Sequence, residues 1–132
     1  ITMNEKKIIQ IAANTKSFGL ENKFPLKAKS KNKVCGDEIA VEVNKDINEM
    51  RFETQSCIFT QASAAILANH LAKMHKLGLE NVLDAIKKKL NGETGDLPIQ
   101  IKDLDFLTHK DHKTRKECIA LPFNAVIKAI HD

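Results

Sequence analysis

Three cysteines and one aspartate are the residues of this sequence best suited to bind a metal ion. Cys35 and Asp37 flank Gly36, while Cys57 and Cys118 each stand close to the expected start of a helix. Thiolates are soft ligands that bind zinc or iron–sulfur clusters, and a carboxylate adds a harder oxygen ligand. If the fold brings these loop edges together, the four side chains form a site for a thiophilic metal.

The cysteines also have a simpler interpretation. No Cys-x-x-Cys pair is present, and lone cysteines are more often small buried hydrophobic residues. Two observations favour a metal site: each cysteine lies at an element boundary beside polar residues, and Gly36 leaves the space between Cys35 and Asp37 clear. His109 and His112 could supply a nitrogen ligand in place of Asp37, although such a pair more often lies in a solvated loop.

Composition limits the kind of protein. The chain has 132 residues, 42% of them hydrophobic, a net charge of +4 and no Trp or Tyr. We therefore expect one soluble domain over residues 1–132. Six Phe provide only a small aromatic stacking surface, and no basic stripe is present, which argues against nucleic acid as a partner. The lysines are spread widely, which favours simple solubility over an acidic protein partner.

Location is predicted from the same composition. The longest apolar run, 62–68, is far too short to span a bilayer, so we expect no membrane partner. An odd number of widely spaced cysteines is unlike a secreted disulfide framework. We therefore expect a reducing compartment, the cytoplasm.

Hydrophobic periodicity predicts the elements that position these residues. Helical spacing over residues 3–16 predicts an N-terminal helix, and alternation around 24–29 predicts an edge strand. Ile39, Val41 and Val43 alternate with Glu38, Ala40 and Glu42, and a second alternating run, 50–55, follows a turn at 44–48. These two runs predict a hairpin with one apolar and one charged face.

Helices are the remaining elements that can cover the apolar face. We expect helices over 60–77 and 79–90, ended by Gly78 and Gly92, a helical turn over 103–107 capped by Asp103, and a last helix from about Pro122 to Ile130. The fold class is therefore α+β: a small three-stranded antiparallel sheet covered on one face by helices, with an N-terminal helix.

Three ordered motifs resemble the IscU/SufU/NifU N-terminal family of iron–sulfur cluster assembly proteins. Residues 32–37, Asn-Lys-Val-Cys-Gly-Asp, are similar to the family's Asn-Pro-x-Cys-Gly-Asp. Residues 57–65 resemble its Cys-x-x-Ser-x-Ala-Ser-Ala segment, and residues 115–123 resemble the SufU-type Arg-x-Lys-Cys-Ala-x-Leu-x-Trp. Glu117 replaces the His of IscU, and the IscU chaperone segment Leu-Pro-Pro-Val-Lys is missing. The resemblance is therefore closer to the SufU branch.

The resemblance implies Cys35, Asp37, Cys57 and Cys118 as ligands, and a cysteine desulfurase as sulfur donor. We expect Cys118 to accept persulfide sulfur, and the site to hold a transient [2Fe–2S] cluster for downstream apo acceptor proteins. Asp37, the weaker ligand, would keep that cluster labile. In a SufU-like alternative the same residues hold Zn²⁺ and the protein accepts persulfide without building a cluster. We expect a scaffold rather than an enzyme; if the protein is an enzyme, it is a zinc-dependent sulfurtransferase. A protein-interaction module is the third class considered.

Overall fold

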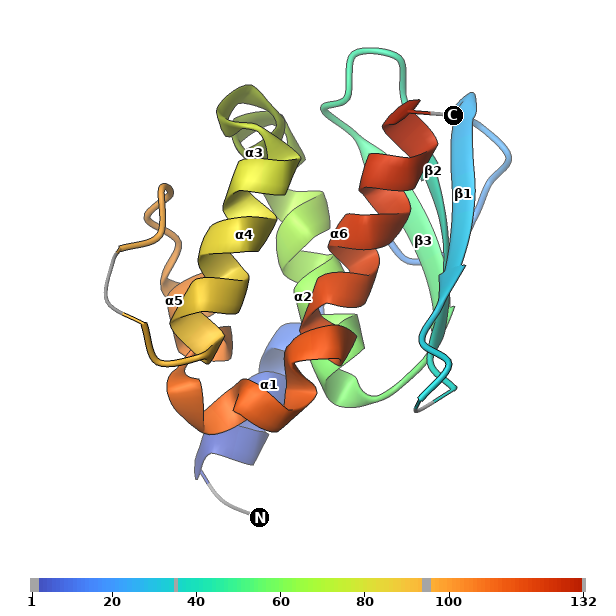
Figure 1. Cartoon of the computed structure of the whole chain (residues 1–132). Coiled ribbons are helices and arrows are strands. Elements are labelled where there is room, and N and C mark those ends of the chain that lie inside the picture. The colour runs from blue at the N-terminus through green and yellow to red at the C-terminus, as the bar shows by residue number, and fades with distance from the viewer. Residues whose placement is uncertain (1–2, 35, 94–95, 132) are drawn as a thin grey trace.

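The computed structural model describes residues 3–34, 36–93 and 96–131, which form a three-stranded sheet with a layer of helices on one face (Figure 1). In chain order the elements are α1 (Met3–Ala12), β1 (Leu26–Lys31), β2 (Glu38–Val43), β3 (Met50–Gln55), α2 (Ile58–Asn69), α3 (Leu71–Leu77), α4 (Leu79–Leu90), α5 (Lys102–Leu107), the 3-10 helix η1 (Lys110–Arg115) and α6 (Lys116–His131). The predicted α+β class, the three strands and the N-terminal helix are confirmed.

The sheet is antiparallel with the strand order β1-β2-β3. Val41 of β2 lies between Ala28 of β1 and Phe52 of β3, so every second residue of each strand points toward the helices. Ile39, Val41 and Val43 on this face of β2 are buried, as the alternation predicts.

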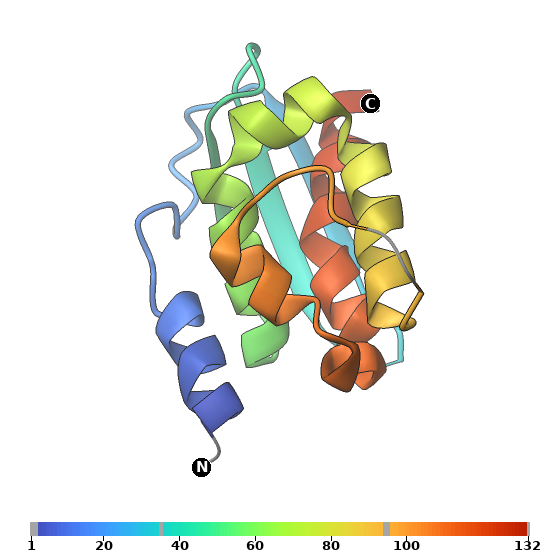
Figure 2. The ribbon, with the colours of Figure 1, turned by 90° about the vertical axis from the view of Figure 1, so that its left-hand side faces the viewer.

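The helix layer is centred on α2 and α6, which pack against each other, and α6 also contacts β1 and β2. Both helices carry small residues that are fully buried, such as Ala62 of α2 and Ala125 of α6. α1 lies to one side of this layer against α2 (Figure 2), with Ile8 buried. α1, α2 and α6 therefore share one hydrophobic core with the sheet.

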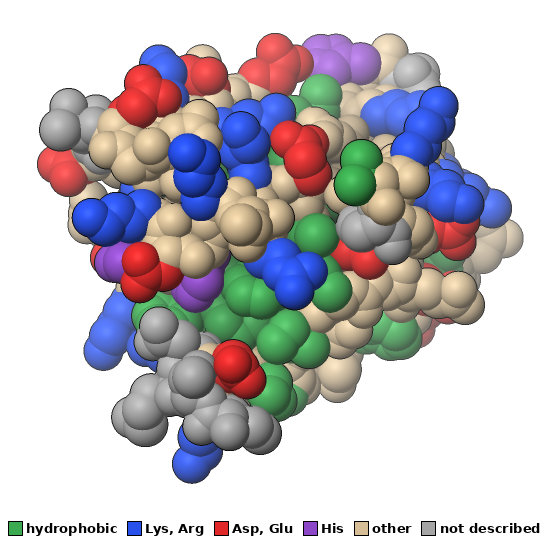
Figure 3. Space-filling model, turned by 60° about the horizontal axis from the view of Figure 1, so that its bottom comes forward, with side chains coloured by type: hydrophobic (Ala, Val, Ile, Leu, Met, Phe, Trp, Pro, Cys, Tyr) green, Lys and Arg blue, Asp and Glu red, His purple; other side chains and the backbone are tan. Residues whose placement is uncertain are grey.

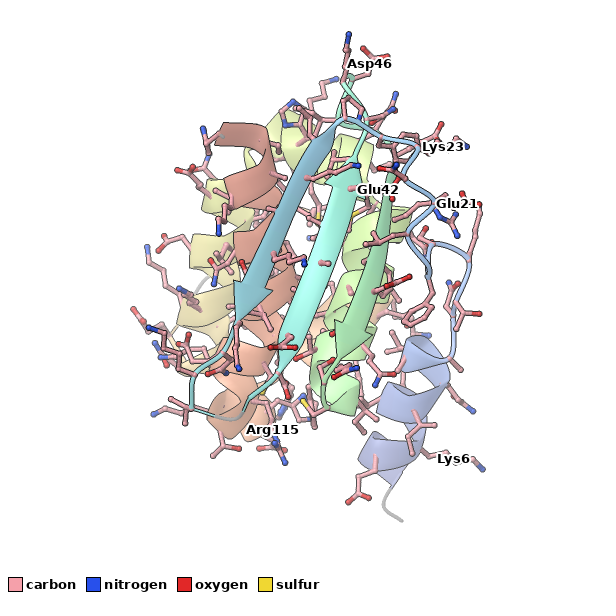
Figure 4. All side chains as sticks on the ribbon, turned by 90° about the vertical axis from the view of Figure 1, so that its right-hand side faces the viewer. Lys6, Glu21, Lys23, Glu42, Asp46 and Arg115 are labelled. Carbon is pink, nitrogen blue, oxygen red and sulfur yellow. The ribbon has the colours of Figure 1, made fainter. Side chains whose placement is uncertain are left out.

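The outer face of the sheet holds a feature that the alternation did not predict. Glu42 was expected on a charged, exposed face, but it is only 1% exposed because the segment before β1 crosses over it. Its carboxylate accepts hydrogen bonds from four successive backbone N–H groups, those of residues 21–24, at 2.8–3.0 Å. Figure 4 shows Glu42 on β2, beside the segment that carries Glu21 and Lys23.

Three predicted helix boundaries are wrong. The first helix ends at Ala12 rather than near residue 16, and the helix expected over 60–77 is divided into α2 and α3 at His70, whose φ of −128° and ψ of 22° are not helical. α5 follows Ile101 rather than being capped by Asp103, which lies in its first turn. None of these changes moves a predicted ligand.

The last helix was also predicted wrongly. α6 begins at Lys116, and Pro122 lies in its interior instead of at its first turn. Proline has no N–H, so the helix carbonyl four residues earlier loses its usual hydrogen-bond donor, and another group must donate to it. As described below, α2 supplies that donor.

No helix among the described residues is long and apolar enough to cross a bilayer.

Candidate metal centre

Three segments that are far apart in sequence bring three of the predicted ligands together. Asp37 directly precedes β2, Cys57 directly precedes α2, and Cys118 lies in the first turn of α6. The two sulfur atoms and a carboxylate oxygen all lie within 4.8 Å of one another. They meet at the lower end of the molecule in Figure 1, where α2 and α6 begin.

Sheet register explains why Asp37 and Cys57 meet. Glu38, the first residue of β2, pairs with Gln55, the last residue of β3. Antiparallel pairing therefore places the residue before β2 beside the residues that follow β3. Gly36 has a φ of +78°, a value that glycine adopts without strain, and its N–H donates to the carbonyl of Asn32 to close the β1–β2 loop.

The Asp37 carboxyl group is the centre of the hydrogen-bond network at this site. Burial alone would raise its pKa, but hydrogen bonds from the Thr60 hydroxyl, from the Cys57 thiol and backbone N–H, and from the Cys118 thiol outweigh that effect and lower the pKa below its usual value. Asp37 is therefore a carboxylate at neutral pH, although it is only 7% exposed.

This donor set fits a thiophilic metal ion. Two thiols and an ionised carboxylate, all within ligand reach of one another, are donors that zinc and iron accept. Cys35, the fourth predicted ligand, lies outside the described residues. Its neighbours Val34 and Gly36 lie in the same loop as Asp37, and Val34 is exposed. The assignment of these four residues as ligands stays a prediction.

Thr60 is a site residue that sequence reasoning did not single out. Its side chain is fully buried, and its hydroxyl oxygen lies 2.9 Å from Asp37 Oδ2 and 2.9 Å from the carbonyl oxygen of Cys118. The Cys57 sulfur is 3.8 Å away. The available signal was position alone: Thr60 follows Cys57 by three residues, so both face the same side of α2.

The histidines near Cys118 do not join this cluster. Among the described residues, the group of mutually close ligand atoms includes neither His109, His112 nor Glu117. His109 and Glu117 are exposed. The solvated loop expected for His112 is wrong: it is 8% exposed, its ring packs edge-on against Phe59, and its Nδ1 lies 2.9 Å from the carbonyl of Leu107.

A pocket of about 470 Å³ opens beside Cys57. Ile8 of α1, Ile58 and Phe59 provide its apolar lining, and the guanidinium of Arg115 lies over the Phe59 ring at 5.4 Å. Figure 3, which turns this end toward the viewer, shows hydrophobic side chains gathered there among charged ones. Cys57 is half-buried and accessible from this pocket, whereas Cys118 is only 5% exposed.

Comparison with known proteins gives a consistent result. The family model of the NifU-like N-terminal domain matches residues 3–120. The fold is similar to that of a protein assigned as an iron–sulfur cluster assembly scaffold for the SUF system from Fervidobacterium islandicum AW-1, with a TM-score of 0.76, 21% identity, and 95% of this chain and 94% of that chain covered.

A second solved structure, a nitrogen-fixing NifU-like protein (N-terminal part) from Brucella abortus, has a TM-score of 0.74 and 23% identity, with 96% of this chain and 92% of that chain covered. A third, a hypothetical protein, has a TM-score of 0.73 and 20% identity, with 98% of each chain covered. No curated protein matches the sequence.

Proposed function

The chain belongs to the family of NifU-like N-terminal domains, and on that basis we propose that it is an iron–sulfur cluster assembly protein that accepts sulfur from a cysteine desulfurase and holds a labile cluster for transfer. The observation that carries the proposal is the convergence of Asp37, Cys57 and Cys118 within 4.8 Å. A SUF-system protein with this fold supports the SufU branch.

Sulfur transfer requires a thiolate that can attack a persulfide. We assign this role to Cys118, which lies in the first turn of the 16-residue helix α6. The N-terminal end of a helix carries partial positive charge and favours a thiolate there. The thiolate attacks the terminal sulfur of the donor persulfide. The donor S–S bond breaks, its electron pair stays on the desulfurase cysteine, and Cys118 becomes the persulfide, so no external oxidant is needed.

The ligand set suits an iron–sulfur cluster that is later transferred to another protein. Thiolates of Cys35, Cys57 and Cys118 would bind the iron atoms of a cluster strongly, whereas the Asp37 carboxylate is a harder and weaker partner for such a cluster. The pocket beside Cys57, which has apolar and charged lining residues, leaves room for a partner protein to approach this end. Downstream apo proteins would take the cluster from the same side.

Zinc is the alternative occupant of the site. A carboxylate must be deprotonated to bind a metal ion, and the lowered pKa of Asp37 meets this condition for zinc as it does for iron. Three thiolates and one carboxylate complete a four-ligand set of the kind that holds zinc. A zinc ion supplies Lewis-acid stabilisation of thiolates, and the protein would then accept persulfide without building a cluster. We propose a reducing, cytoplasmic setting, in which thiols stay available as ligands.

Anaerobic purification followed by metal and sulfide analysis separates the two forms. A scaffold is expected to contain iron and acid-labile sulfide and to absorb in the visible range, whereas the zinc form is colourless. Asp37→Ala, which removes the candidate carboxylate ligand, should change the metal content or the stability of the bound form. Asp84→Ala, which removes an exposed carboxylate from α4, is its control and should change neither. Wild-type protein that contains neither metal, and that binds neither after reconstitution, would contradict the proposed function.

Persulfide mapping tests the assignment of the sulfur acceptor. After incubation with a cysteine desulfurase and cysteine, alkylation and peptide mass spectrometry should locate the extra sulfur on Cys118. Cys57→Ser, which removes a neighbouring thiol, is the matched control and should keep the modification. Sulfur found on Cys57 in the wild type, with Cys118 unmodified, would refute this role for Cys118.

A further inference from the structure

Pro122 leaves an unusual gap in the backbone of α6. In a continuous helix the carbonyl of Cys118 would accept a hydrogen bond from the N–H of residue 122, four positions later. Proline has no N–H, so this bond cannot form. A buried carbonyl without a donor is costly, and another group must therefore serve it.

Two hydroxyl groups of α2 meet this stretch of α6. Thr60 lies 2.9 Å from the carbonyl oxygen of Cys118, and Ser63 donates to the carbonyl oxygen of Ile119 at 2.6 Å. Both side chains are fully buried, and they lie one helical turn apart on the same face of α2. Hydroxyls of α2 thus hold the beginning of α6 in place.

Thr60 differs from Ser63 in one respect. Its hydroxyl also lies 2.9 Å from Asp37 Oδ2, and the Cys57 sulfur is within 3.8 Å. One side chain therefore touches all three segments that carry the described candidate ligands. A hydroxyl has a single proton, so the Asp37 carboxylate and the Cys118 carbonyl share or alternate as its acceptor.

We propose that Thr60 is a positioning residue of the metal centre: it fixes the Asp37 carboxylate relative to the backbone of Cys118 before a metal ion arrives. The inference rests on the proposed function, since it assumes that Asp37 and Cys118 are ligands. With a cation in the site, the Asp37 carboxylate would be a weaker acceptor, and Thr60 would then donate its proton to the Cys118 carbonyl. Loading of the site and the anchoring of α6 are thereby coupled through one hydroxyl.

Three variants test this role with Co²⁺ as the probe. Thr60→Val keeps the shape of the side chain and removes the hydroxyl, Thr60→Ser keeps the hydroxyl, and Ser63→Ala removes the neighbouring hydroxyl that touches no candidate ligand. Dissociation constants are measured from thiolate-to-cobalt absorption in competition with a chelator. The stability of each metal-free variant is measured separately by urea unfolding.

We expect Thr60→Val and Ser63→Ala both to destabilise the metal-free protein, because each removes a buried hydrogen bond to a carbonyl of α6. Only Thr60→Val should weaken Co²⁺ binding, by about 10- to 100-fold, as is usual when a hydrogen-bond partner of a metal ligand is lost. Thr60→Ser should bind within a few-fold of wild type. If Thr60→Val does not fold, Thr60→Ala replaces it in the comparison.

Two outcomes would overturn the inference while leaving the proposed function intact: wild-type affinity in Thr60→Val, or an equal loss of affinity in Ser63→Ala. Failure of the wild-type protein to bind Co²⁺ through thiolates would instead count against the proposed function itself, and the inference would fall with it.

Discussion

Replacing Glu42 with Gln should destabilise the protein, because Glu42 organises the segment that leads into β1. The carboxylate is buried and accepts N–H groups from Glu21 and Asn22 on Oε1 and from Lys23 and Phe24 on Oε2. Gln keeps one acceptor oxygen but turns an NH₂ group toward two of these donors. No other single side chain among the described residues accepts from so many backbone groups.

The magnitude follows from those contacts. A hydrogen bond to a charged acceptor contributes about 1.5–3 kcal/mol, so two lost bonds set an upper range of roughly 3–6 kcal/mol. Residues 21–23 are exposed, and water can hydrate part of what is released. We therefore expect the free energy of unfolding to fall by about 2–4 kcal/mol, a large part of the ~5–15 kcal/mol typical of a domain.

Urea unfolding at pH 7, followed by far-UV circular dichroism because the chain has no Trp or Tyr, measures this loss. The matched control is Glu38→Gln on the same outer face of β2. Glu38 is half-exposed and forms an ion pair with Lys31, which should contribute about 1 kcal/mol or less. Equal losses in the two variants would refute the special role of Glu42.

The pH dependence gives an independent check. Burial raises the pKa of Glu42, but the four backbone donors outweigh it, and its pKa in the folded protein is below the ordinary value of 4.5. The carboxylate therefore contributes stability above that ordinary value, and the contribution is lost as pH falls through the folded pKa. The gap between wild type and Glu42→Gln should narrow on acidification; a constant gap would contradict this reasoning.

Two further predictions concern the site. Asp37→Ala should lengthen the lifetime of a reconstituted cluster, measured by the decay of its visible absorption, because the weaker ligand favours release; an unchanged lifetime would count against that role for Asp37. Pro122→Ala should reduce the stability cost of Thr60→Val by about 1 kcal/mol, because the new N–H at position 122 serves the Cys118 carbonyl. Additive costs in this double-mutant cycle would show that the carbonyl does not depend on Thr60.

Local pattern was enough to predict the sheet and the best-defined helix. The alternation of Ile39, Val41 and Val43 identifies β2, because a strand buried on one face repeats every second residue. Glycines at 78 and 92 bound α4, which spans Leu79–Leu90 as predicted. The motifs also indicated which residues would converge, since Asp37, Cys57 and Cys118 do meet.

What the sequence could not predict depends on contacts between distant segments. From the local sequence, Pro122 is expected at the start of a helix. It lies inside α6 instead, where the Thr60 hydroxyl, 58 positions away in sequence, can donate to the carbonyl of Cys118. Glu42 reads as a surface residue unless the segment before β1 crosses it. His112 reads as solvated unless Phe59 and Phe106 close around it.

The most direct test of the central claim is zinc-edge X-ray absorption on Zn²⁺-loaded protein. A site made by Cys35, Asp37, Cys57 and Cys118 predicts one zinc per chain, with three sulfur neighbours at about 2.3 Å and one oxygen at about 2.0–2.2 Å. Cys57→Ser should remove one sulfur from that shell. A shell of nitrogen and oxygen alone, or a sulfur shell unchanged in Cys57→Ser, would contradict the account.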